Sequence, residues 1–167
     1  MTPPFLIEVL GPGHARAEFS SGVEALDRYF REQVTQDVRR RATVCYVVHD
    51  VARAKVAGYY TLAAAGVALA DLPEDLVKRL PRYPSVPVAR LGRLAVDQAY
   101  RGQHLGGALL WDAAMRALRS EIAVYALVVD AKDEQAVRFY RHHGFATFGS
   151  LPRQLILPLA NLVLPKG

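Results

Sequence analysis

The chain has 167 residues, of which 51% are hydrophobic and 22% are charged. This length and composition are typical of a folded globular protein and exclude an intrinsically disordered chain. Lysine and arginine together number 21, against 16 aspartates and glutamates, which gives a formal net charge of +5. Because arginine forms bidentate contacts with phosphate, this excess favours a polyanionic partner, either a coenzyme or a nucleic acid. A moderately basic protein without a nucleic-acid role has the same composition, so charge alone does not decide.

Cys45 is the only cysteine, so no intramolecular disulfide can form and no oxidising compartment is required. It lies in the apolar run 43–48, which predicts a buried and unreactive thiol. The N-terminus lacks the basic and long apolar regions of a signal peptide, and no segment reaches the ~20 apolar residues of a membrane helix. We therefore expect a cytoplasmic protein that does not enter the membrane.

Residues 5–10 are predicted to form the first strand, which a Gly-Pro-Gly turn at residues 11–13 ends. Ser21 and Glu24 have the spacing of a helix capping box. From there, apolar residues follow at spacings of three and four and predict an amphipathic helix over residues 22–40.

The middle of the chain is rich in β-branched and aromatic residues, which favour strands. Strands are predicted at residues 43–50, 55–63 and 88–96, with a short helix at 73–80. Residues 82–87 lead into the third of these strands as an extended segment stiffened by proline.

The last third alternates between helices and strands. The predicted elements are a loop at 97–107, a helix at 105–120, a buried strand at 123–129, a helix at 132–142 with Gly144 as its C-cap, and strands at 145–148 and 154–157. The apolar run 155–164, which Pro158 interrupts, is interpreted as an edge strand or a partner surface. This order predicts an α/β or α+β fold in a single domain over residues 1–167.

The segment 91–110 reads as a strand, a glycine-rich turn and the start of a helix. Such a turn directs successive backbone N–H groups at a phosphate, and the helix N-terminus adds a favourable field. Small residues allow the ligand to approach the backbone closely. The pattern therefore indicates a phosphate or pyrophosphate site, although a purely structural turn has the same residue types.

This segment resembles the central motif of the GNAT acetyltransferases, in which an apolar-Val-Asp strand end is followed by Arg/Gln-x-x-Gly-x-Gly/Ala. Arg101 and Gly106 match the first and last positions, whereas His104 stands where the family has glycine. Histidine is one of the non-glycine residues enriched at positive φ, so we expect the turn to keep its geometry.

A second segment, residues 133–145, resembles the family's Asn/Asp-x-x-Ala-x-x-Phe-Tyr-x-x-x-Gly-Phe motif. Further short segments, at residues 19–22, 26–30, 58–62 and 91–97, are similar to the GNAT toxins of bacterial toxin–antitoxin pairs. The resemblance covers nearly the whole chain. It implies a GNAT fold, with splayed central strands in a mixed sheet, and a toxin that acetylates the α-amine of aminoacyl-tRNA and so blocks translation. It also implies an antitoxin partner and a homodimer.

By the same resemblance, acetyl-CoA lies between the strands at 88–96 and 123–129. The residues implied in coenzyme binding are Leu94, Ala95, Val96, Arg101, Gly102, Gln103, His104, Leu105, Gly106, Gly107 and Asp133. Tyr140 matches the family's tyrosine near the coenzyme sulfur and is expected to protonate the departing thiolate. Without the family, core packing would be the simpler interpretation of this tyrosine.

The expected tRNA contacts are cationic side chains near the acceptor site, namely Lys78, Arg79, Arg82, Arg90 and Arg93, with a second patch at residues 39–41. Such binding would weaken steeply with salt. No metal site is expected, because no Cys or carboxylate cluster completes a site with His104, His142 and His143. The adjacent His142 and His143 point in different directions on a helix, and His14 and His49 carry no readable pattern. Two alternatives stay open: a GNAT enzyme for a small-molecule amine or protein N-terminus, and a non-catalytic module that binds coenzyme or RNA.

Overall fold

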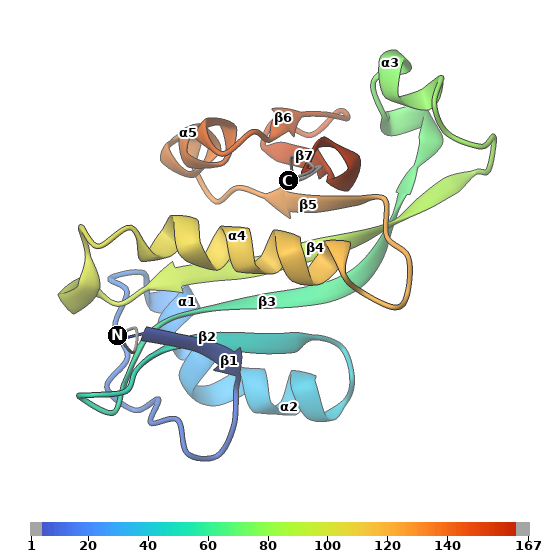
Figure 1. The fold of residues 1–167 in the computed structure, drawn as a ribbon. Helices are drawn as coiled ribbons and strands as arrows, with labels where there is room; N and C mark the ends of the chain where they lie inside the picture. Colours follow the sequence, from blue (N-terminus) through green and yellow to red (C-terminus); the bar gives the residue numbers. More distant parts are fainter. Residues whose placement is uncertain (1–4, 163–167) are drawn as a thin grey trace, which may run out of the picture. The chain divides into compact units, whose positions relative to one another are not determined.

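A computed structural model describes residues 5–162. Its seven strands have the order β1-β2-β3-β4-β5-β7-β6 in a mixed sheet with helices (Figure 1), which confirms the expected fold class. The chain divides into two compact units, unit 1 (Met1–Ala63 and Gly92–Ala113) and unit 2 (Ala64–Leu91 and Ala114–Gly167). It passes from one unit to the other inside β3 (Lys55–Ala68) and β4 (Ser85–Val96).

The sheet of unit 1 begins with an antiparallel pair, β1 (Phe5–Val9) and β2 (Val44–Asp50). β2 also pairs antiparallel with β3, and the register shifts at Val48/His49. The predicted strands at residues 5–10 and 43–50 agree with β1 and β2 to within a residue at each end. Only β3 is much longer than predicted, because it continues beyond residue 63 into unit 2.

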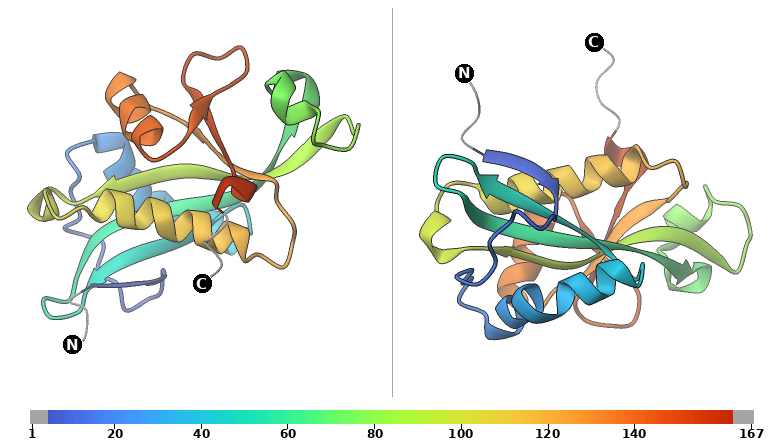
Figure 2. Two further views of the ribbon diagram at one scale, coloured as in Figure 1. Left: turned by 45° about the horizontal axis from the view of Figure 1, so that its top comes forward. Right: turned by 90° about the horizontal axis from the view of Figure 1, so that it is seen from below.

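The predicted helix of unit 1 is present but is not a regular α-helix. It consists of α1 (Glu24–Arg28), a π-helical turn η1 (Tyr29–Gln33) and α2 (Val34–Arg39). Figure 2 shows these segments following one another along the sheet of unit 1. Their apolar side chains join the core, where the rings of Phe30 and Tyr59 stack at 4.3 Å. Cys45 lies in this core as predicted, and burial raises the pKa of its thiol to about 12.

The predicted capping box is wrong. The helix starts at Glu24 after Val23, and no side chain caps it. Ser21 lies two residues before the N-cap, Val23. Its hydroxyl instead donates to the buried Asp27 carboxylate at 2.6 Å and accepts from the Val23 amide at 3.2 Å. Ser21 therefore bonds to the buried Asp27 carboxylate instead of capping the helix, because a buried charge needs hydrogen-bond partners.

In unit 2, β4 pairs parallel with β5 (Ala126–Asp130), over the four pairs from Val88↔Ala126 to Leu91↔Val129. β7 (Gln154–Pro158) pairs antiparallel with β5 on one side and with β6 (Ala146–Thr147) on the other. The C-terminal apolar run is therefore an interior strand rather than an edge strand, which explains its burial. Its last residues, 163 and 164, lie outside the described part of the chain.

Short helices complete the chain. α3 (Glu74–Val77) is shorter than predicted, with Pro73 as its N-cap, and α4 (Leu105–Leu118) and α5 (Glu134–His142) agree closely with the predicted helices. The 3-10 turns are η2 (Leu69–Asp71), η3 (Gln98–Tyr100) and η4 (Leu159–Leu162). Gly144 follows α5 with a φ of 96°, as expected of a C-cap glycine. Across residues 5–162, none of these helices is long and apolar enough to span a membrane.

Candidate coenzyme-binding turn and catalytic tyrosine

Within unit 1, the end of β4 leads through a tight turn into α4 (Figure 1). The Asp97 carboxylate fixes the start of this turn, because its Oδ1 accepts from the Ala99 amide at 2.9 Å and so caps η3. The carboxylate's Oδ2 accepts from the Ser20 amide at 3.0 Å. The aspartate of the sequence motif is thus a structural residue that holds the turn in shape.

The turn itself uses left-handed backbone conformations at two positions. Gly102 has a φ of 82° and His104 a φ of 60°, so histidine does adopt the conformation predicted for the position where the family has glycine. His104 is exposed, and its carbonyl accepts from the Ala108 amide at 3.2 Å, which is the first helical bond of α4.

This helix start leaves its first N–H groups available to a ligand. The amides of Leu105, Gly106 and Gly107 precede the first helical bond and have no acceptor within an α-helix. Successive amides at the positive end of a helix dipole form an anion site. The amides of residues 105–107 therefore form a candidate anion site.

Arg101, which the sequence assigned to the coenzyme, contacts the protein itself. Its guanidinium donates to the Ser21 carbonyl at 2.9 Å, and next to it the Gln98 amide donates to the Ser20 carbonyl, also at 2.9 Å. These bonds join the turn to the segment before α1, so Arg101 positions the turn in this structure.

Gly22 allows this close approach. It has a φ of 89°, and a Cβ at this position would lie 2.3 Å from Nε2 of Gln98. The sequence pattern marks Gly22 only as a helix start, because the contact with Gln98 joins segments more than 70 residues apart.

Two residues of β3 support the end of β4 from the neighbouring strand and were also missed. The Thr61 hydroxyl accepts from the Arg93 amide at 3.0 Å, and a Cβ on Gly58 would lie 2.8 Å from the Ala95 carbonyl oxygen. A glycine inside a predicted strand is a signal of close backbone approach, so Gly58 could have been found from sequence. Together they hold the backbone of Leu94, Ala95 and Val96 against β3.

Tyr140 and Asp133 belong to unit 2, on and before α5. Asp133 is the N-cap of the helix, and its carboxylate accepts from the Ala136 amide at 2.8 Å, so this side chain serves the helix. Tyr140 is buried between Phe139 and Phe145, with ring centroids at 5.2 and 5.5 Å. Burial raises the pKa of its phenol well above the usual value, which keeps the proton on the oxygen at neutral pH.

The four arginines expected to contact tRNA divide into two kinds. Arg79 and Arg82 are exposed in the connection between α3 and β4. Arg90 forms an ion pair with Asp130 at 2.6 Å, and the Arg93 guanidinium lies 3.4 Å from the ring centroid of Tyr29. Arg79 and Arg82 are therefore better placed for solvent-exposed phosphate than Arg90 and Arg93, whose side chains have partners within their own unit.

Within unit 1, a strand end followed by a helix start with free first amides is typical of a site for a donor that carries phosphate. Residues 14–145 match the model of the acetyltransferase (GNAT) family, and the chain belongs to this family.

Two curated relatives are similar over most of their length. A tRNA-acetylating toxin of Mycobacterium tuberculosis is 36% identical over 141 residues, covering 83% of this chain and 82% of the relative. A probable toxin TacT of Sinorhizobium fredii is 29% identical over 167 residues, covering 94% and 92%.

Solved structures of the toxin AtaT are similar in fold. AtaT complexed with acetyl-methionyl-tRNAfMet superposes with a TM-score of 0.86 at 27% identity, over 95% of this chain and 96% of that one. AtaTR bound with AcCoA superposes with a TM-score of 0.81 at 27% identity, with the same coverage.

Proposed function

We propose that this acetyltransferase is a toxin that transfers an acetyl group from acetyl-CoA to the α-amine of aminoacyl-tRNA and so blocks translation. The observation that carries this proposal is the 36% identity to a tRNA-acetylating toxin across more than four fifths of both chains. The AtaT complexes with acetyl-methionyl-tRNAfMet and with AcCoA support the same acceptor and the same donor.

The coenzyme turn of unit 1 would hold the donor through backbone groups. The amides of residues 103–107 suit the pyrophosphate, and the backbone of Leu94, Ala95 and Val96 suits the pantetheine arm and the acetyl carbonyl. An N–H group directed at that carbonyl stabilises the oxyanion that forms during attack. Arg101 and Asp133 contribute indirectly, because the first positions the turn and the second caps α5.

In the reaction, the neutral amine attacks the thioester carbonyl carbon, the C–S bond breaks, and the nitrogen loses a proton to solvent. An α-amine has a pKa of about 8, so a useful fraction is neutral at cellular pH without a strong general base. The departing thiolate takes a proton, and we propose Tyr140 as its donor. The support for this role is that Tyr140 matches the tyrosine of the family motif and holds its proton at neutral pH.

For the acceptor, we propose that Arg79 and Arg82 contact tRNA phosphates, together with the neighbouring exposed Lys78. Residues 39–41, also exposed, form a second candidate patch at the end of α2. We propose that Arg90 and Arg93 contribute less to tRNA binding, because contact with RNA would break the ion pair of Arg90 and the ring contact of Arg93.

We also propose that the two units act together as one catalytic domain in the cytoplasm, as a homodimer controlled by an antitoxin. Because β3 and β4 each run through both units, neither unit has a contiguous sequence. His104 keeps the left-handed turn, so the histidine at the glycine position is no argument for a non-catalytic module.

The decisive experiment is transfer of labelled acetyl from acetyl-CoA to a pool of charged tRNA, with uncharged tRNA and free amino acids as controls. Label on charged tRNA alone is the expected result, and identifying the labelled species gives the amino-acid specificity. Label on a free amine or peptide but not on RNA would overturn the tRNA assignment in favour of the small-molecule or protein N-terminal alternative.

A further inference from the structure

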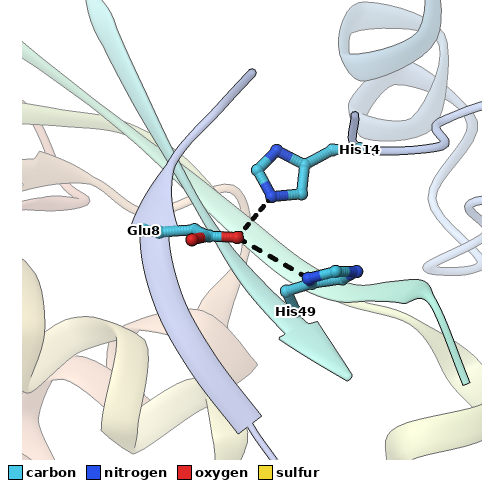
Figure 3. Close-up of side chains that lie close together, drawn as sticks. All are labelled: Glu8, His14 and His49. Atoms are coloured by element: carbon cyan, nitrogen blue, oxygen red, sulfur yellow. Dashed lines mark hydrogen bonds and ion pairs between the residues drawn. The ribbon is translucent and has the colours of Figure 1, made fainter. Parts of the chain in front are cut away.

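Three polar side chains that are distant in sequence meet at the N-terminal part of unit 1 (Figure 3). Glu8 lies on β1, His14 in the loop after β1, and His49 on β2. Nε2 of His14 is 2.7 Å from Oε1 of Glu8, and Nδ1 of His49 is 3.6 Å from the same oxygen. Each of the three residues offers one possible ligand atom, and these atoms all lie within 4.8 Å of one another.

The local fold explains the convergence. Leu6 pairs with His49 in the antiparallel register of β1 and β2, so Glu8, two residues further, is the diagonal neighbour of His49 on the same face. His14 returns to this face through the Gly-Pro-Gly turn, in which its own amide donates to the Gly11 carbonyl at 3.1 Å. Pro12 stands at the second position of this turn, where its fixed φ is favourable.

We propose that Glu8, His14 and His49 form a binding site for a divalent transition-metal ion, with Zn²⁺ as the best-fitting ion. Two imidazoles and one carboxylate are a ligand set that zinc accepts in a tetrahedral site whose fourth position is open to water. The side chains are 9%, 38% and 20% exposed for His14, Glu8 and His49, so an ion can reach them from solvent.

The distances suit a small ion. Zinc–ligand bonds of about 2.0–2.2 Å place the ligand atoms of a tetrahedral site roughly 3.3 Å apart. The observed separations of 2.7 and 3.6 Å lie on either side of this value, so small side-chain rotations suffice. Mg²⁺ and Ca²⁺ prefer oxygen ligands and six or more partners, which excludes them as favoured occupants.

The hydrogen bonds of His14 show which of its two ring nitrogens carries the hydrogen. The Gly11 amide donates to Nδ1 at 2.9 Å, so Nδ1 carries no hydrogen and Nε2–H is the group that donates to Glu8. A bound ion takes the place of this hydrogen on Nε2. The neutral ring then carries its proton on Nδ1, and the bond from the Gly11 amide is lost.

This rearrangement has two consequences. Metal-binding histidines usually donate their second ring nitrogen to an acceptor, and here the partner is a donor that has to move away. The site is therefore reversible, in contrast to a permanent structural zinc. In addition, the Gly11 amide reports directly on occupancy of the His14 position.

The experiment is calorimetric titration of the full chain with ZnCl₂, with MgCl₂ as the control ion, together with thermal unfolding. We expect one Zn²⁺ per chain and a Tm raised by roughly 5–10 °C at an ion concentration ~100 times Kd, with no effect of Mg²⁺. Glu8→Gln and His49→Gln should each reduce zinc affinity at least tenfold. His142→Ala removes an exposed histidine elsewhere and should leave it unchanged, and circular dichroism confirms that each variant is folded.

Amide NMR provides a test that does not depend on the variants. Zinc should shift the Gly11 amide resonance as its bond to His14 breaks, whereas Gly149 in unit 2 should not move. Absence of zinc binding would overturn the proposal and leave a hydrogen-bonded cluster only. So would binding that survives both substitutions in the cluster, or binding that leaves the Gly11 amide unchanged.

Discussion

The coenzyme turn of unit 1 and helix α5 of unit 2 carry the two sequence motifs of the family, but they contribute in opposite ways. In the turn, the side chains of Asp97 and Arg101 bond within the protein, and the backbone amides of residues 105–107 are the proposed ligand contacts. In α5, the backbone is helical and a single buried side chain, Tyr140, is the proposed proton donor. Donor binding should therefore respond to changes in backbone conformation, and turnover to the removal of one oxygen atom.

The largest effect should come from a change to the Tyr140 side chain. Tyr140→Phe removes the phenolic proton donor but keeps the ring that packs on Phe139 and Phe145. We expect turnover to fall by about 10²–10⁴-fold, with acetyl-CoA affinity unchanged, because general acid assistance is worth that much. Steady-state kinetics with charged tRNA and calorimetry with acetyl-CoA check both parts, and a folded variant with wild-type turnover would show that Tyr140 only packs.

The importance of the left-handed backbone conformation in the turn can be tested at His104. Substituting a β-branched residue, His104→Val, should lower acetyl-CoA affinity by about tenfold, because a left-handed conformation costs a non-glycine residue roughly 1–2 kcal/mol and a β-branched one more. The matched variant His104→Gly should bind at least as well as wild type. If His104→Gly loses affinity instead, the imidazole itself contacts the donor, and the division between backbone and side chain would need revision.

The close packing of β3 against the end of β4 can be tested by substituting Gly58. A methyl group there would lie 2.8 Å from the Ala95 carbonyl oxygen, so Gly58→Ala should cost about 1–3 kcal/mol, which corresponds to a Tm lower by roughly 3–10 °C. Gly66→Ala in the same strand is the control, since its nearest atoms are at 3.9 Å. Thermal unfolding of both variants measures this, and equal Tm values would show that β3 can move away from β4.

The smallest effect concerns the pair beside the turn, Tyr100 and Asp50. The Tyr100 hydroxyl donates to the Asp50 carboxylate at 2.6 Å and lowers the pKa of that carboxyl. Because the folded pKa lies below the unfolded value of about 3.9, this bond stabilises the fold above that pH, and the gain is lost as the pH falls through the folded pKa. Tyr100→Phe should therefore lower Tm at pH 7 and lose less Tm than wild type between pH 5 and pH 3. Parallel acid profiles would contradict this assignment.

Much of the fold was readable from sequence because it depends on local patterns. Apolar periodicity located α4 and α5, and β-branched runs located β2 and the start of β3. The π-helical turn at Tyr29–Gln33 was not predicted, since a single inserted residue leaves the apolar spacing nearly unchanged. The interior position of β7 was missed because strand order depends on pairing between distant segments.

The candidate site shows the same division. The left-handed turn at His104 followed from a motif and a known conformational preference, and the structure confirms it. The bonds of Arg101 to Ser21 and of Thr61 to Arg93 could not be predicted, because each joins residues far apart in sequence. The meeting of Glu8, His14 and His49 was invisible for the same reason, since it depends on the register between β1 and β2.

The interleaving of the two units bears on how the protein is made. Unit 1 lacks its second segment until residue 113 has been synthesised, and unit 2 is completed only by the C-terminal strands β6 and β7. In a nascent chain the proposed donor-binding turn is therefore synthesised before Tyr140, and strands β6 and β7 follow after both. For an enzyme proposed to acetylate the substrates of translation, this order means that each ribosome finishes the toxin before that molecule can act on the machinery that made it.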